Sequence, residues 1–157
     1  MRRAGWLVAV LLLAGCGIEP SGVTDGGDAP TGVAPGMTLY FIDSAGALVP
    51  QQPATGSLGS VSDALSLLLA STSSPGRRTE IADVGVTRVG VVVAGDSIEL
   101  RVPLAARDVT ARGIDQIVCT AIAAHVQSGG SPGSTVRIIF TVAGPGADHA
   151  RTCPVIG

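Results

Sequence analysis

Two amphipathic helix patterns, each following a pair of short β-forming runs, constrain the fold of this chain most strongly. The first covers 61–69, where apolar residues recur at i, i+3, i+4, i+7 and i+8: Val61, Ala64, Leu65, Leu68 and Leu69. Ser60 and Asp63 precede it like a capping box in which Asp replaces Glu. The second runs from about 109 to 127 and ends before glycines, with one face formed by Ile114, Ile117, Val118, Ala121, Ile122 and His125. Both patterns predict helices that pack against a core.

The remaining β-forming runs predict five strands. Two hairpins are expected, one with strands 38–42 and 47–49 and one with strands 84–93 and 97–102, and a last strand at 135–142. This order of hairpin, helix, hairpin, helix and strand favours an α/β fold. We expect a small two-layer sandwich with two helices packed on one mixed β-sheet of about five strands. A jelly roll or immunoglobulin sandwich would need more strands and no second helix.

The N-terminus has the features of a bacterial lipoprotein signal peptide. Arg2 and Arg3 precede the apolar run 6–13, which is too short to span a bilayer. The sequence then reads Leu-Ala-Gly-Cys up to Cys16, which matches the lipobox. We therefore expect a signal peptide over 1–15 and acylation of Cys16, which would hold the chain on the extracytoplasmic face of the cell membrane. The alternative is a buried helix followed by a chance cysteine.

Composition divides the mature chain into a tether, a domain and a tail. The range 17–36 contains six glycines and three prolines without apolar periodicity, so 16–36 is predicted to be a flexible tether with an end-to-end distance of about 25 Å. The range 37–144 contains every predicted helix and strand. The remaining 145–157 is predicted to be a C-terminal tail.

Charge and aromatic content exclude several classes of binding site. The ten basic residues are all arginines, and removal of the signal peptide leaves eight of them against twelve carboxylates. The resulting net charge of −4 argues against nucleic acid as a partner. The aromatic residues left in the mature chain are Tyr40, Phe41 and Phe140, all inside predicted strands. A stacking platform for sugars or bases is therefore not expected.

No motif in the chain indicates catalysis. His125 on the apolar face of the second helix suggests either a ligand or base, or a histidine at the rim of the core near the helix C-terminus. Neither His125 nor His149 has metal-type spacing. The one G-x-S-x-G string, 129–133, lies between a predicted helix and a predicted strand, whereas a nucleophile elbow joins a strand to the helix that follows it. The glycine-rich 128–134 follows a helix and precedes a strand, which is typical of a connector and not of a phosphate loop. We expect no catalytic, cofactor-binding or metal-binding residue, and we expect Arg77 and Arg78 to be solvated loop charges.

The order of these elements resembles the GerMN domain. The similarity covers about 37–144, and the motifs that carry it are Leu39-Tyr40-Phe41 with its D-x-x-G turn, Gly95 to Leu100, Gln116-Ile117-Val118-Cys119-Thr120, and Val136 to Gly144. Cys119 stands where the family has an aromatic residue, and Ala143 stands where it has an aspartate. GerMN domains occur in spore-germination proteins and in actinobacterial lipoproteins of the LpqB type. The resemblance implies an envelope module without catalytic residues that mediates protein contacts outside the membrane.

Two cysteines remain once lipidation has consumed Cys16. In an oxidising compartment, Cys119 on the flank of the second helix could bond Cys153 if the tail crosses that flank. We therefore predict a Cys119–Cys153 disulfide. The alternative is a small buried apolar side chain at Cys119 and an unbonded thiol in the tail.

Together these observations favour a membrane-anchored, non-enzymatic interaction module of the cell envelope. Its expected partners are the membrane, through acylated Cys16, and an envelope or membrane protein. The first alternative is an extracytoplasmic carrier of a small ligand, with a pocket between helix and sheet. The second is a serine hydrolase.

Overall fold

A computed structural model describes residues 36–53, 59–142 and 150–156, which belong to one compact unit, Ala34–Gly157. In chain order the elements are β1 (Leu39–Ile42), β2 (Leu48–Gln51), α1 (Val61–Leu69), β3 (Gly90–Ala94), β4 (Ser97–Val102), a 3-10 turn η1 (Ala106–Asp108), α2 (Ala111–Gln127), β5 (Thr135–Phe140) and β6 (Ala150–Arg151). The predicted α/β fold and the order of its elements are confirmed. The predicted signal peptide, Cys16 and His149 lie outside the described residues.

The strands form two sheets where one was predicted. The larger sheet has the order β3-β4-β5-β6, with β4 and β5 parallel and the other neighbours antiparallel. The second sheet is the antiparallel hairpin of β1 and β2. Helix α2 makes the crossover between the parallel strands β4 and β5, as parallel pairing requires.

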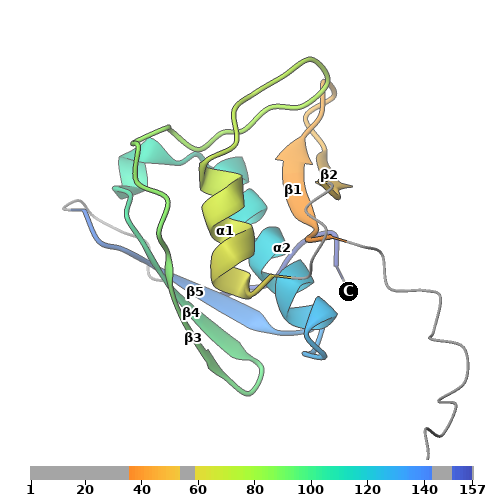
Figure 1. Ribbon diagram of the computed structural model, residues 1–157, viewed down its shortest axis with the longest axis vertical. Coiled ribbons are helices and arrows are strands. Elements are labelled where there is room, and N and C mark those ends of the chain that lie inside the picture. The colour runs from red at the N-terminus through yellow and green to blue at the C-terminus, as the bar shows by residue number, and fades with distance from the viewer. Residues whose placement is uncertain (1–35, 54–58, 143–149, 157) are drawn as a thin grey trace, which may run out of the picture. The chain divides into compact units, whose positions relative to one another are not determined.

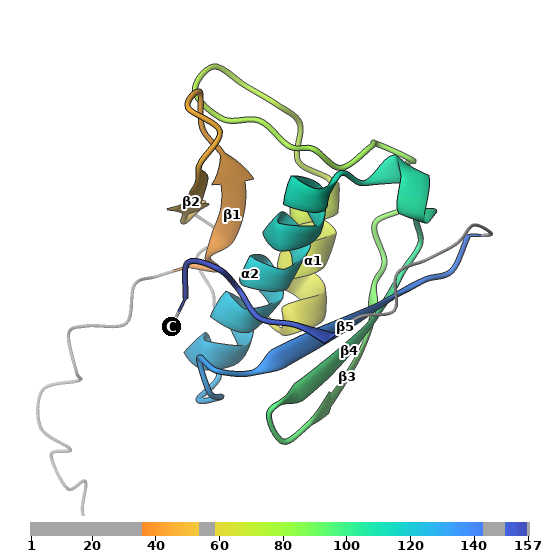
Figure 2. The same cartoon turned by 180° about the vertical axis from the view of Figure 1, so that it is seen from behind.

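The two helices lie between the sheet and the hairpin (Figures 1 and 2). Helix α2 contacts α1, β1 and β5, while α1 also contacts β1 and β3. One cluster of buried side chains joins all these elements, with its largest fully buried members at Phe41, Leu39, Leu65, Leu68, Ile98, Leu100, Leu104, Ile117 and Ile122. The helices are therefore covered on two sides, where a two-layer sandwich would cover them on one.

Helix α1 forms as its sequence pattern predicts. The Ser60 hydroxyl accepts a hydrogen bond from Asp63 N–H at 3.2 Å, and the Asp63 carboxylate accepts one from Ser60 N–H at 2.9 Å. All five residues of the predicted apolar stripe are buried. Burial of this stripe and the capping box together fix where the helix begins and which face it turns to the core.

Helix α2 is buried on more sides than a single stripe requires. It begins at Ala111 after Thr110, whose hydroxyl accepts from Gly113 N–H at 3.1 Å, slightly later than predicted. Ile117, Val118 and Ile122 are buried as expected, and so are the polar Gln116 and Thr120. The polar pair is buried because the β1–β2 hairpin packs on that side of the helix.

The outer edge of β1 explains why the hairpin stays apart from the sheet. Thr120 Oγ1 accepts from Tyr40 N–H at 3.0 Å, and Gln116 Nε2 donates to Tyr40 C=O at 3.1 Å. At the next outward position, Ile42 and Arg78 exchange two backbone hydrogen bonds at 2.8 and 3.0 Å. Because these partners satisfy the backbone groups of β1 that face away from β2, no further strand joins the hairpin there.

The largest differences from the predicted boundaries lie at the start of β3 and in the C-terminal segment. The run 84–93 becomes a strand only at Gly90, because Gly85 has a φ of +69° and its N–H bonds the Asp83 carboxylate at 2.9 Å, which forms a turn. A strand also lies within the predicted tail, where β6 pairs with β5. The disulfide described below holds this end of the chain on α2.

Candidate functional site

Strand β3 lies at the edge of the larger sheet, with β4 on one side and no other strand of the described chain on the opposite side (Figure 1). It joins β4 through the two-residue turn Gly95-Asp96, in which Gly95 has a φ of +57°. A two-residue turn makes Ala94 and Ser97 a hydrogen-bonded pair. By alternation, the N–H and C=O of Val91 and Val93 point away from β4.

These outward backbone groups are open. No described residue outside the ladder with β4 bonds the N–H or C=O of Val91 or Val93. Just before the strand, Val89 C=O is already occupied, since it accepts from the Ser62 hydroxyl at 2.8 Å. The open stretch, which we call the β3 edge, therefore consists of the outer side of Gly90–Ala94.

The β3 edge lacks the charges and prolines that normally protect an edge strand. It contains no charged residue and no proline, although it is short, at five residues. Val92 and Val93 are 58% and 46% exposed, against a fully buried Ile98 opposite Val93 on β4. Edge strands of soluble proteins usually carry charges, prolines or bulges that prevent pairing with another chain. An uncharged edge with exposed valines is typical of a surface that accepts another strand.

A groove of about 390 Å³ borders this edge on the side of the helices. We call it the β3 groove; its lining comes from the start of α1, the end of α2 and the inner face of β3, and consists of Ser60, Val61, Ser62, Val91, Val93, His125 and Ser128. The hydroxyl of Ser62 is bonded to Val89 C=O, and that of Ser60 to the Asp63 carboxylate at 2.7 Å. The Ser128 hydroxyl donates to Ala124 C=O at 3.0 Å, so all three serine hydroxyls of the lining form hydrogen bonds within the fold.

The hydrogen bonds from Ser60 also act on the acidity of Asp63. The Ser60 hydroxyl, followed by the Ser60 N–H, lowers the pKa of the Asp63 carboxyl below its usual 3.8. The ionised carboxylate is therefore the form that caps α1 at neutral pH.

His125 is half-buried at the C-terminal end of α2 and faces the groove. A Cβ atom at Gly130 would lie 2.1 Å from His125 Nε2, so the ring lies directly against this glycine and would have to move to admit any other residue there. The His125 side chain makes no hydrogen bond within the described residues. Of the two interpretations of His125 from sequence, the placement at the rim of the core fits its position.

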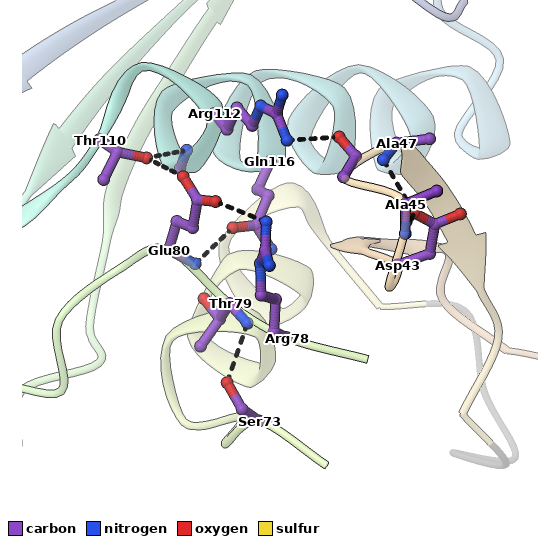
Figure 3. Close-up of polar contacts among 12 residues, drawn as sticks. Asp43, Ala45, Ala47, Ser73, Arg78, Thr79, Glu80, Thr110, Arg112 and Gln116 are labelled. Carbon is purple, nitrogen blue, oxygen red and sulfur yellow. Dashed lines mark hydrogen bonds and ion pairs between the residues drawn. The ribbon is translucent and has the colours of Figure 1, made fainter. Parts of the chain in front are cut away.

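A second polar cluster joins α2 to the loop before β3 (Figure 3). The side-chain oxygen of Gln116 accepts from Glu80 N–H at 2.9 Å, and the Glu80 carboxylate accepts from the Thr110 hydroxyl and from Arg78 at 3.2 Å. Arg112 donates to Gly46 C=O in the β1–β2 turn at 2.7 Å. Each of these groups bonds backbone or side chains of neighbouring segments, so the cluster positions the loop and the hairpin against α2.

Arg77 does not behave as the predicted solvated loop charge. Its guanidinium lies 4.5 Å from the centre of the Phe41 ring and donates to the Gln51 side chain at 3.3 Å. Arg78, which is exposed, forms the ion pair with Glu80. Sequence reasoning missed this because Phe41 lies 36 positions away and approaches only in the folded chain.

The predicted disulfide is present. Cys119 and Cys153 are bonded, and both are buried, with exposed fractions of 0% and 4%. The bond attaches the C-terminal segment to α2, and Ile156 packs against the core beyond it.

The described residues contain no group of three or more His, Cys, Asp or Glu side chains placed to hold a metal ion. Within the same ranges, no helix has the length and apolar character needed to cross a bilayer.

No protein-family model matches the sequence, and neither a curated protein nor a solved structure matches it. The resemblance to the GerMN domain therefore stays a prediction from the residues that carry it.

Proposed function

We propose that this protein is a lipid-anchored, non-enzymatic interaction domain of the cell envelope that binds its partner by adding a strand to the β3 edge. The observation that carries the proposal is the set of open N–H and C=O groups at Val91 and Val93, on an uncharged strand with exposed valines. An extended segment can form backbone hydrogen bonds with such an edge, and its alternate side chains can enter the β3 groove.

The anchor in this proposal is acylated Cys16 after a signal peptide over 1–15. The lipobox supports it, and a tether over 16–36 would keep the domain near the outer face of the membrane. Confinement to a thin layer raises the effective concentration toward a membrane-bound partner into the millimolar range. At that effective concentration, an interface as short as the β3 edge is enough to bind the partner.

The experiment is photo-crosslinking in living cells with a photoreactive residue at position 93. We expect adducts with the native chain, and we expect Val92→Lys to reduce them at least about tenfold, because a charge opposes strand addition. Val155→Lys is the matched control, since Val155 is 53% exposed and belongs neither to β3 nor to the lining of the β3 groove. Equal adducts in Val92→Lys and Val155→Lys would refute the proposed use of the β3 edge.

A second candidate is binding of a small ligand in the β3 groove. The groove volume of about 390 Å³ lies at the lower end of the range of ligand pockets, and its lining combines three valines with hydroxyl groups and an imidazole. Native mass spectrometry of the exported chain distinguishes the two functions. A retained molecule that disappears in His125→Ala would favour the ligand carrier.

The serine hydrolase alternative has less support. The Ser60 hydroxyl hydrogen-bonds the Asp63 carboxylate within the cap of α1, and the His125 ring bonds neither group in the described residues. An activity-based serine probe that labels the native chain would restore this alternative.

A further inference from the structure

We propose that the strand that pairs with the β3 edge is β3 of a second copy of this chain, in an antiparallel arrangement about a two-fold axis at Val92. This inference rests on the proposed function and names its partner.

The backbone allows this register. A two-fold axis at Val92 pairs Val91 with Val93 of the second copy, and these are the residues whose N–H and C=O point outward. Each such pair can exchange two hydrogen bonds, which makes four across the interface. The two Val92 residues then face each other as a non-hydrogen-bonded pair, in which side chains lie closest.

The side chains are self-complementary in the same register. Every residue from Gly90 to Ala94 is uncharged, so no charge is opposed within the strand pair. On the inner face, Val91 and Val93 of one copy continue the apolar lining of the other's groove. On the outer face, the exposed Val92 residues, each 58% exposed in the single chain, cover one another. An isologous two-fold interface requires this kind of self-complementarity.

Charge complementarity at the two ends of the edge favours a second copy over an unrelated strand. The register centred on Val92 brings Arg88, two residues before the strand, toward Asp96 of the second copy in the turn just after it, and the symmetry repeats the pair at the other end. Both residues are exposed, and neither side chain makes an ion pair or hydrogen bond within the described chain. A strand shifted by two residues would lose both pairs.

The interface is small, so its occupation depends on confinement. Five residues on each side bury less area than a stable dimer in solution needs. Two copies anchored in one membrane are confined to the same layer, which favours pairing at cellular abundance.

The test is disulfide trapping of the full chain in its native envelope. A Val92→Cys variant places two thiols on the two-fold axis, and a non-reducing gel then reports the covalent dimer. We expect at least about a fivefold greater dimer fraction than for Val155→Cys, whose parent side chain has similar exposure. Equal trapping in the two variants would overturn the second-copy assignment.

A charge exchange tests the register itself. In the Val92→Cys background, Arg88→Asp alone and Asp96→Arg alone each create two like-charged pairs and should reduce trapping severalfold. Co-expression of the two variants with different tags should restore trapping as mixed dimers, because each copy then supplies the opposite charge. Trapping that is unchanged in both single variants, or not restored by mixing, would overturn the arrangement.

The experiments separate this inference from the proposed function. Adducts at position 93 that contain a different protein and are lost in Val92→Lys, without trapping by Val92→Cys, would overturn the second copy and retain strand addition. If neither the position-93 adducts nor the Val92→Cys dimer is observed, both the second-copy inference and the proposed strand addition are overturned.

Discussion

At the scale of single residues, Gln116 holds three segments together. Its amide nitrogen donates to Tyr40 C=O in β1, and its amide oxygen accepts from Glu80 N–H in the loop before β3. The side chain itself is fully buried on α2. We expect Gln116→Leu to lower the free energy of unfolding by about 3 kcal/mol, because it leaves the buried Tyr40 C=O and the partly buried Glu80 N–H without partners. Urea unfolding of the exported Cys16→Ser chain, followed by circular dichroism, measures this.

The control for Gln116 is Gln52, which is exposed and makes one long hydrogen bond of 3.3 Å to Thr38. Gln52→Leu should change the free energy of unfolding by less than about 0.5 kcal/mol. Equal unfolding midpoints for the two variants would contradict the role assigned to Gln116.

Asp63 gives the stability of α1 a dependence on pH. Its pKa is lowered below 3.8 in the folded chain, so the ionised carboxylate stabilises the fold above the unfolded-state pKa, and this contribution is lost as pH falls through the folded-state pKa. Asp63→Asn should therefore be less stable than the native chain at neutral pH, and the difference should shrink well below pH 3.8. The effect is small because Asp63 is exposed.

Thermal unfolding of both chains across this pH range provides the measurement for Asp63. A difference between the native chain and Asp63→Asn that stays constant from neutral to acidic pH would show that the carboxylate charge has no part in the cap.

At the scale of elements, local patterns predict what each segment becomes, and long-range contacts decide where it is placed. The apolar stripe and capping box of α1 are local, so its bounds and buried face follow from the sequence. The burial of Gln116 and Thr120 depends on a hairpin about 80 positions earlier in the chain. The apolar pattern of α2 alone therefore does not predict that Gln116 and Thr120 are buried.

The same distinction applies to the candidate site. The β-branched run at 90–94 predicts a strand, but strand order is set by pairing between distant segments. That β3 lies at the edge, and that Val91 and Val93 carry its open backbone groups, therefore emerges only from the fold. The residue type alone makes His125 a candidate in the sequence. The groove that it lines is formed by three separate elements and is visible only in the folded chain.

The C-terminal segment gives a prediction at this scale. The Cys119–Cys153 bond closes a loop with a sequence separation of 34, for which the chain-entropy relation gives about 4 kcal/mol of stabilisation. We expect Cys153→Ser to lower the free energy of unfolding by about this amount, because β6 and Ile156 lose their attachment to α2. Urea unfolding with and without reductant measures the loss.

The control for the disulfide compares how reductant changes the stability of the native chain and of a variant without the bond. The native chain should lose stability when reduced, while a Cys119→Ala, Cys153→Ser double variant should not change. A native chain that is equally stable with and without reductant would contradict the role of the bond.

At the scale of the whole molecule, the proposed anchor makes a prediction about activity in the cell. Export of a Cys16→Ser chain at native abundance should leave the domain in the soluble fraction and fail to rescue the envelope phenotype of a deletion strain, because confinement no longer concentrates it. Detergent-phase partitioning verifies release from the membrane. Full rescue by the released chain would contradict the tethered mode of action.

The contacts between β1 and α2 also set an order of events in folding. The backbone of Tyr40 obtains its outer partners from residues 76 and 80 positions later, so the hairpin at the start of the domain cannot complete its contacts until α2 has emerged. Contacts of such long sequence separation slow folding, because a large loop must close before they contribute stability. If the chain is exported N-terminus first, as its predicted signal peptide implies, β1 must wait for α2 before its outer backbone groups find their partners, and during that interval the chain presents an unpaired β1 edge in addition to that of β3.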